Sequence, residues 1–253
     1  MIRFLDESAR ADAVRRFGAD PFGVRALAGA LAYGDRTLAG VWMQDHATLI
    51  GRTADALTLC GAPPDVFRTA ELLDFFAVTG GRTLLMPAGL LPAPPLRGWS
   101  LRRTGVVMRV AGESRPQAPE TAVSRTVSAR ALTALLCAAQ SPWIETGDPD
   151  ALYVDLSHRL RHDCIRAFVC EADGRPAACA LTDGETPRAA LIGGVAAMPD
   201  QRGHGYASAA LHALCAALRA EKKQIFLFTG AELTGFYRKN GFAVEREWVE
   251  FER

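Results

Sequence analysis

The chain has 253 residues, 49% of them hydrophobic, and its 29 basic and 28 acidic side chains leave a formal net charge of +1. This length and apolar content are enough for one large domain or two small ones with a full core. The near-neutral charge and the lack of a lysine or arginine block argue against a nucleic-acid partner. No apolar run approaches the length of a membrane span, so no membrane partner is expected.

The N-terminus and the cysteines indicate the compartment. Residues 1–17 include acidic side chains and no continuous apolar core, unlike a signal or transit peptide. The six cysteines show no close, metal-like spacing. We therefore expect reduced, mostly buried thiols, no metal site and a cytoplasmic protein.

The first half of the chain predicts a strand, two helices, three strands, a helix, a strand, a loop and a final strand. Asp20-Pro21-Phe22-Gly23 separates the two early helices, and Pro64 opens the later one, which Gly80-Gly81 ends. The helices fall within 8–33 and 64–79, the loop over 87–95, and the strands over 2–5, 37–43, 47–51, 56–60, 83–86 and 104–110.

The second half repeats this order of elements. Helices are expected over 129–139 and from about 233 to 239, and 149–160 is irregular or helical. Asp173-Gly174 is the predicted turn of a hairpin. Strands are expected over 124–127, 165–171, 177–181, 189–198, 225–228 and 242–251. Two copies of one plan are therefore predicted.

The stretch between 188 and 218 is the most informative part of the second half. Pro199 ends a strand, and a helix follows whose apolar side chains share one face, namely Ala207, Leu211, Leu214 and Leu218. Gly203 and Gly205 lie between them. Because glycine has no Cβ, a bulky polyanion can approach the backbone there, where the first helical N–H groups have no partner. The helix dipole and Arg202 add positive charge, so the turn predicts an anion site, although a simple strand-to-helix turn has the same outline.

The turn Arg202-Gly203-His204-Gly205-Tyr206-Ala207 resembles the acyl-CoA signature of the GNAT superfamily of N-acetyltransferases, Arg/Gln-x-x-Gly-x-Gly/Ala. Arg202, Gly205 and Ala207 stand at its fixed positions. The resemblance implies that acetyl-CoA is the co-substrate. The expected contacts with its pyrophosphate come from Arg202, Gly203, His204, Gly205, Tyr206, Ala207 and Ser208, and those with its pantetheine from Ala196, Ala197 and Met198.

A second segment, Phe236-Tyr237-Arg238-Lys239-Asn240-Gly241-Phe242, resembles the family's Phe-Tyr-x-x-x-Gly-Phe. The resemblance implies that Tyr237 points at the CoA sulfur and is the catalytic general acid, and a phenol that stays protonated at neutral pH suits this role. The alternative is an amphipathic helix that packs Tyr237 into the core. One departure is that Thr229, Gly230 and Glu232 stand where many members have an asparagine that contacts CoA.

No general base is visible, because 189–198 contains no acidic residue. His158 is a weak candidate, since its imidazole can take a proton at neutral pH, but it can equally be a solvated helix residue. Water can carry the proton instead.

The resemblance predicts an α/β (α+β) fold of two tandem GNAT-like domains, each a mixed, mostly antiparallel sheet flanked by helices. Residues 1–112 form a degenerate domain, since the matching turn has Asp65 where an anion binds and loses N–H donors to Pro63 and Pro64. Residues 120–253 form the catalytic domain, and the linker lies within 112–119.

The implied function is transfer of an acetyl or other short acyl group from acetyl-CoA to a primary amine by direct attack. The alternatives are a CoA-binding module without catalysis and an interaction module. The acceptor is a small-molecule or peptide amine, and the protein is expected as a monomer or homodimer. Neither the acceptor nor the acyl length follows from the sequence, because variable loops shape such pockets, here including 140–160.

Overall fold

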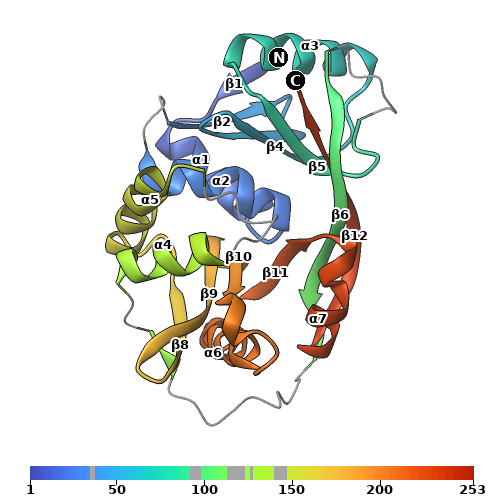
Figure 1. Cartoon of the computed structure of the whole chain (residues 1–253). Coiled ribbons are helices and arrows are strands. Elements are labelled where there is room, and N and C mark those ends of the chain that lie inside the picture. Colours follow the sequence, from blue (N-terminus) through green and yellow to red (C-terminus); the bar gives the residue numbers. More distant parts are fainter. Residues whose placement is uncertain (35–37, 92–97, 113–122, 126–127, 140–146) are drawn as a thin grey trace. The chain divides into compact units, whose positions relative to one another are not determined.

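The computed structural model describes residues 1–34, 38–91, 98–112, 123–125, 128–139 and 147–253. The described chain divides into two compact units (Figure 1). Unit 1 comprises residues 1–108, 186–189 and 244–253, and unit 2 comprises 109–185 and 190–243. Within the described ranges, no helix is long and apolar enough to cross a membrane.

Unit 1 is built on the strand order β1-β2-β3-β4-β5-β12-β6. Parallel pairing joins β4 to β5, and antiparallel pairing joins β1 to β2, β2 to β3, β3 to β4 and β5 to β12. Its elements are β1 (Ile2–Phe4), α1 (Glu7–Phe17), α2 (Pro21–Tyr33), β2 (Ala39–Gln44), β3 (Thr48–Thr53), β4 (Ala56–Gly61), α3 (Val66–Thr79), β5 (Thr83–Pro87), β6 (Ser100–Val110) and β12 (Phe242–Glu252).

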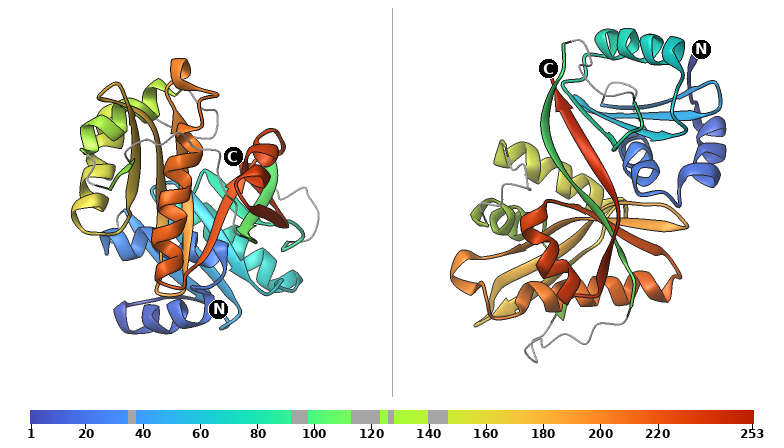
Figure 2. Two further views of the ribbon diagram at one scale, coloured as in Figure 1. Left: turned by 90° about the horizontal axis from the view of Figure 1, so that it is seen from below. Right: turned by 90° about the vertical axis from the view of Figure 1, so that its right-hand side faces the viewer.

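Two helices cover opposite faces of the unit 1 sheet (Figure 2). Ile50 on β3 packs in one core cluster with Leu72 and Phe76 of α3. The next residue, Gly51, points the other way, and a Cβ there would lie 2.2 Å from the Ala26 carbonyl oxygen of α2. The alternation of β3 thus places α3 and α2 on its two sides.

Unit 2 has the strand order β11-β10-β9-β8-β7. Antiparallel pairing joins β7, β8, β9 and β10 in turn. Its elements are β7 (Val123–Ser124), α4 (Ala129–Ala138), α5 (Pro149–Arg161), β8 (Ala167–Ala172), β9 (Arg175–Glu185), β10 (Ala189–Ala197), the 3-10 turn η1 (Pro199–Gln201), α6 (Tyr206–Ala220), β11 (Gln224–Thr229), the 3-10 turn η2 (Ala231–Leu233) and α7 (Thr234–Lys239).

The core of unit 2 lies on both faces of its sheet. Cys179 and Leu181 of β9 pack with leucines of α4 and α5 in one cluster. The alternate residues Ala178 and Ala180 are also fully buried, and α6 packs against β9 and β8 from that side. A helix–sheet–helix sandwich therefore supports the turn between β10 and α6.

The predicted mixed, mostly antiparallel architecture is confirmed, with local differences. The strand expected over 104–110 begins earlier, at Ser100, and the stretch 149–160 proves helical. The strand expected over 124–127 pairs only at 123–124, and residues 126–127 lie outside the described residues. Most of the predicted linker (113–119) and parts of the predicted loops (92–95 and 140–146) also lie outside them.

Candidate active site

The turn between β10 and α6 is set by two left-handed glycines. After η1, Arg202 is extended, and Gly203 and Gly205 have φ values of 82° and 86°. L side chains rarely adopt this region, so both positions favour glycine. A Cβ on Gly203 would meet no protein atom within 4 Å, which leaves the backbone of the turn open to a ligand.

The N-terminus of α6 has no side-chain cap. Gly205 is the N-cap residue, and the first backbone bond of the helix runs from the Ala209 N–H to the Gly205 carbonyl at 3.0 Å. The N–H groups of Tyr206, Ala207 and Ser208 precede this bond and point out of the helix. Together with the helix dipole they form a ready site for an anion.

Four other helices have the side-chain cap that α6 lacks, whereas α4 and α7, like α6, have none. In α1, α2, α3 and α5 an aspartate side chain accepts a hydrogen bond from the first turn. At α3, the equivalent helix of unit 1, Asp65 accepts from the Arg68 N–H at 2.9 Å. A carboxylate of the chain thus occupies the position where α6 leaves its donors exposed, which accounts physically for the predicted degenerate turn.

The side chains of Arg202, His204 and Tyr206 have partners within the protein. Arg202 is exposed overall, and its guanidinium donates to the Ala139 carbonyl after α4. The guanidinium has further N–H donors, so a contact of Arg202 with phosphate stays a prediction. His204 and Tyr206 stack with ring centroids 6.0 Å apart, so their rings pair with each other beside the exposed N–H groups.

The residues predicted to meet pantetheine form the end of β10. Ala196 is buried, whereas Ala197 and Met198 are half-buried. On one edge they continue the ladder to β9, ending with the Met198 N–H bonded to the Ala177 carbonyl at 2.8 Å. The contact of these three residues with pantetheine stays a prediction.

Tyr237 lies on α7 and is 8% exposed. Its ring packs edge-on against Phe236 at 5.1 Å and Phe242 at 5.8 Å between centroids. Burial raises the pKa of Tyr237 to about 12, so the phenol keeps its proton at neutral pH. Packing in the core and a reactive hydroxyl are therefore compatible, although the role of the hydroxyl stays a prediction.

The structure adds a polar contact that sequence reasoning missed. His212 of α6 and Asn240, the residue that follows α7, lie with Nε2 and Oδ1 3.0 Å apart. No local signal could have paired them, because 28 positions separate them. Their contact joins the helix that follows the turn to the helix that carries Tyr237.

The candidate base stays unassigned. His158 lies on α5 with its ring 4.5 Å from that of His162, and the structure brings neither to the turn. An acidic side chain does reach β10 from its neighbour, since a Cβ on Gly193 would lie 2.4 Å from the Asp183 Cβ. Arg159 holds Asp183 by a hydrogen bond to its carbonyl and a 3.6 Å contact with its carboxylate.

Comparisons with known proteins identify a family for part of the chain. Residues 131–242 match the model of the acetyltransferase (GNAT) family. This match includes β10, the turn, α6 and α7. No curated protein matches the chain.

Solved structures resemble the whole chain in fold. A GCN5-related N-acetyltransferase from Kribbella flavida is 15% identical with a TM-score of 0.63, over 93% of this chain and 95% of that one. A GNAT-family acetyltransferase from Colwellia psychrerythraea is 12% identical with a TM-score of 0.59, over 100% and 99%. A tandem GNAT protein from the clavulanic acid biosynthesis pathway is 13% identical with a TM-score of 0.57, over 100% and 98%.

The match of a tandem GNAT protein over the full chain confirms the predicted tandem GNAT-like fold. The family match lies in the second half, over residues 131–242. Residues 131–242 thus form a domain of the acetyltransferase (GNAT) family within a tandem GNAT fold.

Proposed function

We propose that this protein binds acetyl-CoA at the turn before α6 and transfers the acetyl group to a primary amine of a small molecule or peptide. Arg202 and the N–H groups from Gly203 to Ser208 bind the pyrophosphate. Ala196 to Met198 bind the pantetheine through their backbone, and Tyr237 acts as general acid. The second unit carries the chemistry, and the protein works in the cytoplasm as a monomer or homodimer.

One observation carries this proposal: the exposed N–H groups at the start of α6, within the part of the chain that matches the GNAT family. A diphosphate can accept hydrogen bonds from several of these N–H groups at once, and the helix dipole adds to the attraction. Unit 1 has no such group of exposed donors at α3, where Asp65 caps the helix.

The proposed transfer needs no covalent enzyme intermediate. The amine nitrogen attacks the thioester carbonyl, a C–N bond forms and the C–S bond breaks. Tyr237 gives its proton to the departing thiolate, and the attacking nitrogen of the tetrahedral intermediate loses its proton to water or to a base of the protein. Cys215 takes no part as a nucleophile, because burial raises the pKa of its thiol to about 12.

A matched pair of glycine variants tests the binding site. Gly203→Val and Gly174→Val both place a β-branched residue at a positive φ, 82° and 71°, in open space. Both are therefore expected to cost similar backbone strain. Only Gly203→Val should also weaken acetyl-CoA binding, by about tenfold or more, because it alters the direction of the N–H groups.

Calorimetric titration with acetyl-CoA measures the effect, and CoA release with a panel of amines measures transfer. The panel consists of spermidine, kanamycin, tryptamine and a short peptide with a free N-terminus. Equal acetyl-CoA affinity in both glycine variants contradicts the proposed binding site. Tight binding without CoA release on any amine favours the alternative, a CoA-binding module without catalysis.

A further inference from the structure

A chain of hydrogen bonds connects the helix that follows the CoA turn with the helix that carries Tyr237. His212 contacts Asn240 at 3.0 Å, and the Asn240 amide nitrogen donates to the Phe236 carbonyl at 2.8 Å. The backbone N–H of Asn240 bonds the carbonyls of Phe236 and Tyr237. Asn240 is 8% exposed and His212 is half-buried, so the contact lies largely out of water.

The orientation of the Asn240 amide defines the proton on His212. Because Nδ2 donates to the Phe236 carbonyl, Oδ1 is the atom that faces His212. An amide oxygen only accepts, so the His212 Nε2 carries the hydrogen and donates it. Burial lowers the pKa of His212, which favours the neutral Nε2–H form at neutral pH.

The helix that this bond holds is short. Six residues form α7, and the Asn240 N–H closes its last turn onto Phe236 and Tyr237. A six-residue helix has little stability of its own, so tertiary contacts decide its position. A shift of α7 relative to α6 moves the Tyr237 ring with it.

We propose that His212 and Asn240 are positioning residues that hold the Tyr237 hydroxyl at a fixed distance from the acyl-CoA turn. The inference rests on the proposed function and adds to it an explanation of how the general acid is aligned. The turn leads directly into α6, which carries His212, while Asn240 directly follows α7, which carries Tyr237. The hydrogen bond between them therefore sets the distance from diphosphate to phenol, on which proton transfer depends.

Variants of His212 separate positioning from simple packing. His212→Phe keeps an aromatic ring but removes the donor. His212→Gln places an amide nitrogen at the same number of bonds from the backbone, so it can restore the hydrogen bond. The asparagine side chain in His212→Asn is too short to reach Asn240. This variant takes the place of His212→Phe if the His212→Phe protein does not fold.

The expected result is a loss of kcat rather than of binding. With the best amine of the panel, His212→Phe is expected to lower kcat about tenfold, while KM for acetyl-CoA stays within about twofold. His212→Gln restores most of the activity. In the Tyr237→Phe background, His212→Phe has no further effect on kcat, because the group that it positions is already gone.

Two results overturn the inference alone. One is an active His212→Phe protein with wild-type kcat. The other is a loss of kcat that is equally large with and without the Tyr237 hydroxyl, which marks a general structural effect. A wild-type protein that binds no acetyl-CoA, or releases no CoA with any amine, contradicts the proposed function, and the inference falls with it.

Discussion

Tyr237 is the side chain on which the proposed chemistry depends. Its ring lies between Phe236 and Phe242, so removal of the hydroxyl leaves the packing of the ring in place. Tyr237→Phe is expected to lower kcat about 100-fold, the usual size of a general-acid contribution, with acetyl-CoA affinity unchanged. Steady-state CoA release and calorimetric titration measure the two quantities, and Tyr33→Phe in unit 1 is the control.

The raised pKa of Tyr237 gives this prediction a pH signature. Burial favours the neutral phenol and moves its pKa from 10 to about 12, so the proton is retained at all pH values below that range. No loss of kcat through this group is therefore expected between pH 7 and pH 10. A decline in kcat centred well below pH 10 that disappears in Tyr237→Phe contradicts this assignment.

At this scale, local sequence patterns located some site residues and not others. Tyr237 and Gly203 stand in short motifs whose spacing is visible along the chain. The pairing of His212 with Asn240 and the bond from Arg202 to Ala139 join distant segments. Such contacts depend on how helices pack in three dimensions, and one sequence contains no local signal for them.

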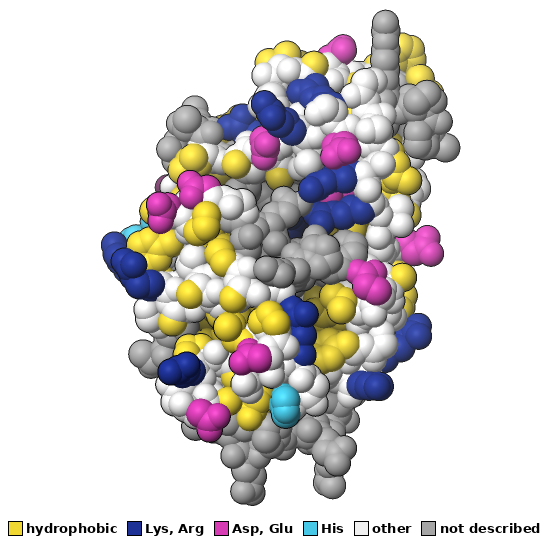
Figure 3. All heavy atoms as spheres, in the orientation of Figure 1, with side chains coloured by type: hydrophobic (Ala, Val, Ile, Leu, Met, Phe, Trp, Pro, Cys, Tyr) yellow, Lys and Arg dark blue, Asp and Glu magenta, His cyan; other side chains and the backbone are white. Residues whose placement is uncertain are grey.

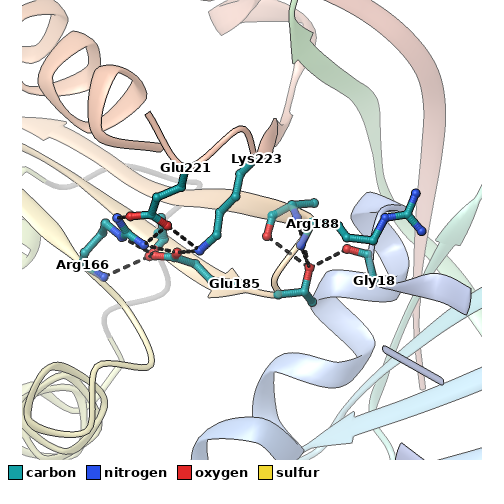
Figure 4. Close-up of polar contacts among 9 residues, drawn as sticks. Gly18, Arg166, Glu185, Arg188, Glu221 and Lys223 are labelled. Carbon is teal, nitrogen blue, oxygen red and sulfur yellow. Dashed lines mark hydrogen bonds and ion pairs between the residues drawn. The ribbon is translucent and has the colours of Figure 1, made fainter. Parts of the chain in front are cut away.

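At the scale of elements, an ion-pair cluster ties the residue before β8 and the end of β9 to the segment after α6 (Figure 4). Glu185 accepts from Arg166 at 2.7 Å and from Lys223 at 2.6 Å, and Glu221 contacts both cations. Burial alone would raise the pKa of Glu185, but the hydrogen bonds and charges of Arg166 and Lys223 outweigh it and lower that pKa. The same partners lower the pKa of Glu221 to about 2.

These lowered pKa values predict an acid-dependent stability. A carboxylate with a lowered folded-state pKa stabilises the fold above its unfolded pKa, and this contribution is lost as the pH falls through the folded value. Glu185→Gln is expected to lose about 2 kcal/mol at pH 7, because it leaves two cations with one carboxylate. The difference from wild type should shrink towards pH 3.

Chemical denaturation at the two pH values measures this effect. Glu171→Gln, an exposed glutamate on β8, is the control and should change stability by about 0.5 kcal/mol or less. If Glu185→Gln lowers the free energy of unfolding equally at pH 7 and pH 3, the shape of the side chain rather than its charge is responsible.

The observed element boundaries match the predicted ones where the capping residues and the hydrophobic periodicity indicate the same position. Asp20 and Pro21, expected to separate two helices, are the N-cap and first residue of α2. The apolar face of α6 and the strand before Pro199 lie as predicted. The early start of β6 was missed, because residues 100–103 are mostly exposed and carry no apolar alternation.

At the scale of the molecule, the last strand belongs largely to unit 1. β12 pairs with β5 from Trp248 to Glu252, and Phe251 lies in the core cluster with Leu57 and Leu84. Sequence order predicts two contiguous parts, 1–112 and 120–253, and these boundaries stay a prediction. A period-2 pattern shows which face of β12 is buried, but it does not show which strand it pairs with.

The packing of β12 predicts which substitution affects unit 1. Phe251→Ala is expected to cost about 3–5 kcal/mol, because it opens a cavity between β12 and α3. Val244→Ala, at a residue that is 42% exposed on the same strand, should cost about 0.5 kcal/mol or less. Hydrogen exchange should show lower protection of β4, β5 and α3 in Phe251→Ala. Unchanged protection there would contradict this role of β12.

The charged side chains on the surface reflect the nearly equal numbers of basic and acidic residues in the sequence. On the face shown in Figure 3, basic and acidic side chains are interspersed. Because neither sign of charge dominates there, that face has no broad basic surface for a nucleic acid. The candidate anion site depends instead on backbone N–H groups, which a count of charged residues does not register.

Ser208 offers the most direct test of the account, because it stands in the first turn of α6. Acetyl-CoA affinity is to be measured by calorimetric titration for Ser208→Asp and for its neutral isostere Ser208→Asn. The aspartate should favour the helix, since a negative charge interacts well with this end of the dipole, yet repel a diphosphate. The account predicts about 30-fold weaker binding for Ser208→Asp than for Ser208→Asn, with no loss of melting temperature. Equal affinity of the two variants would contradict it.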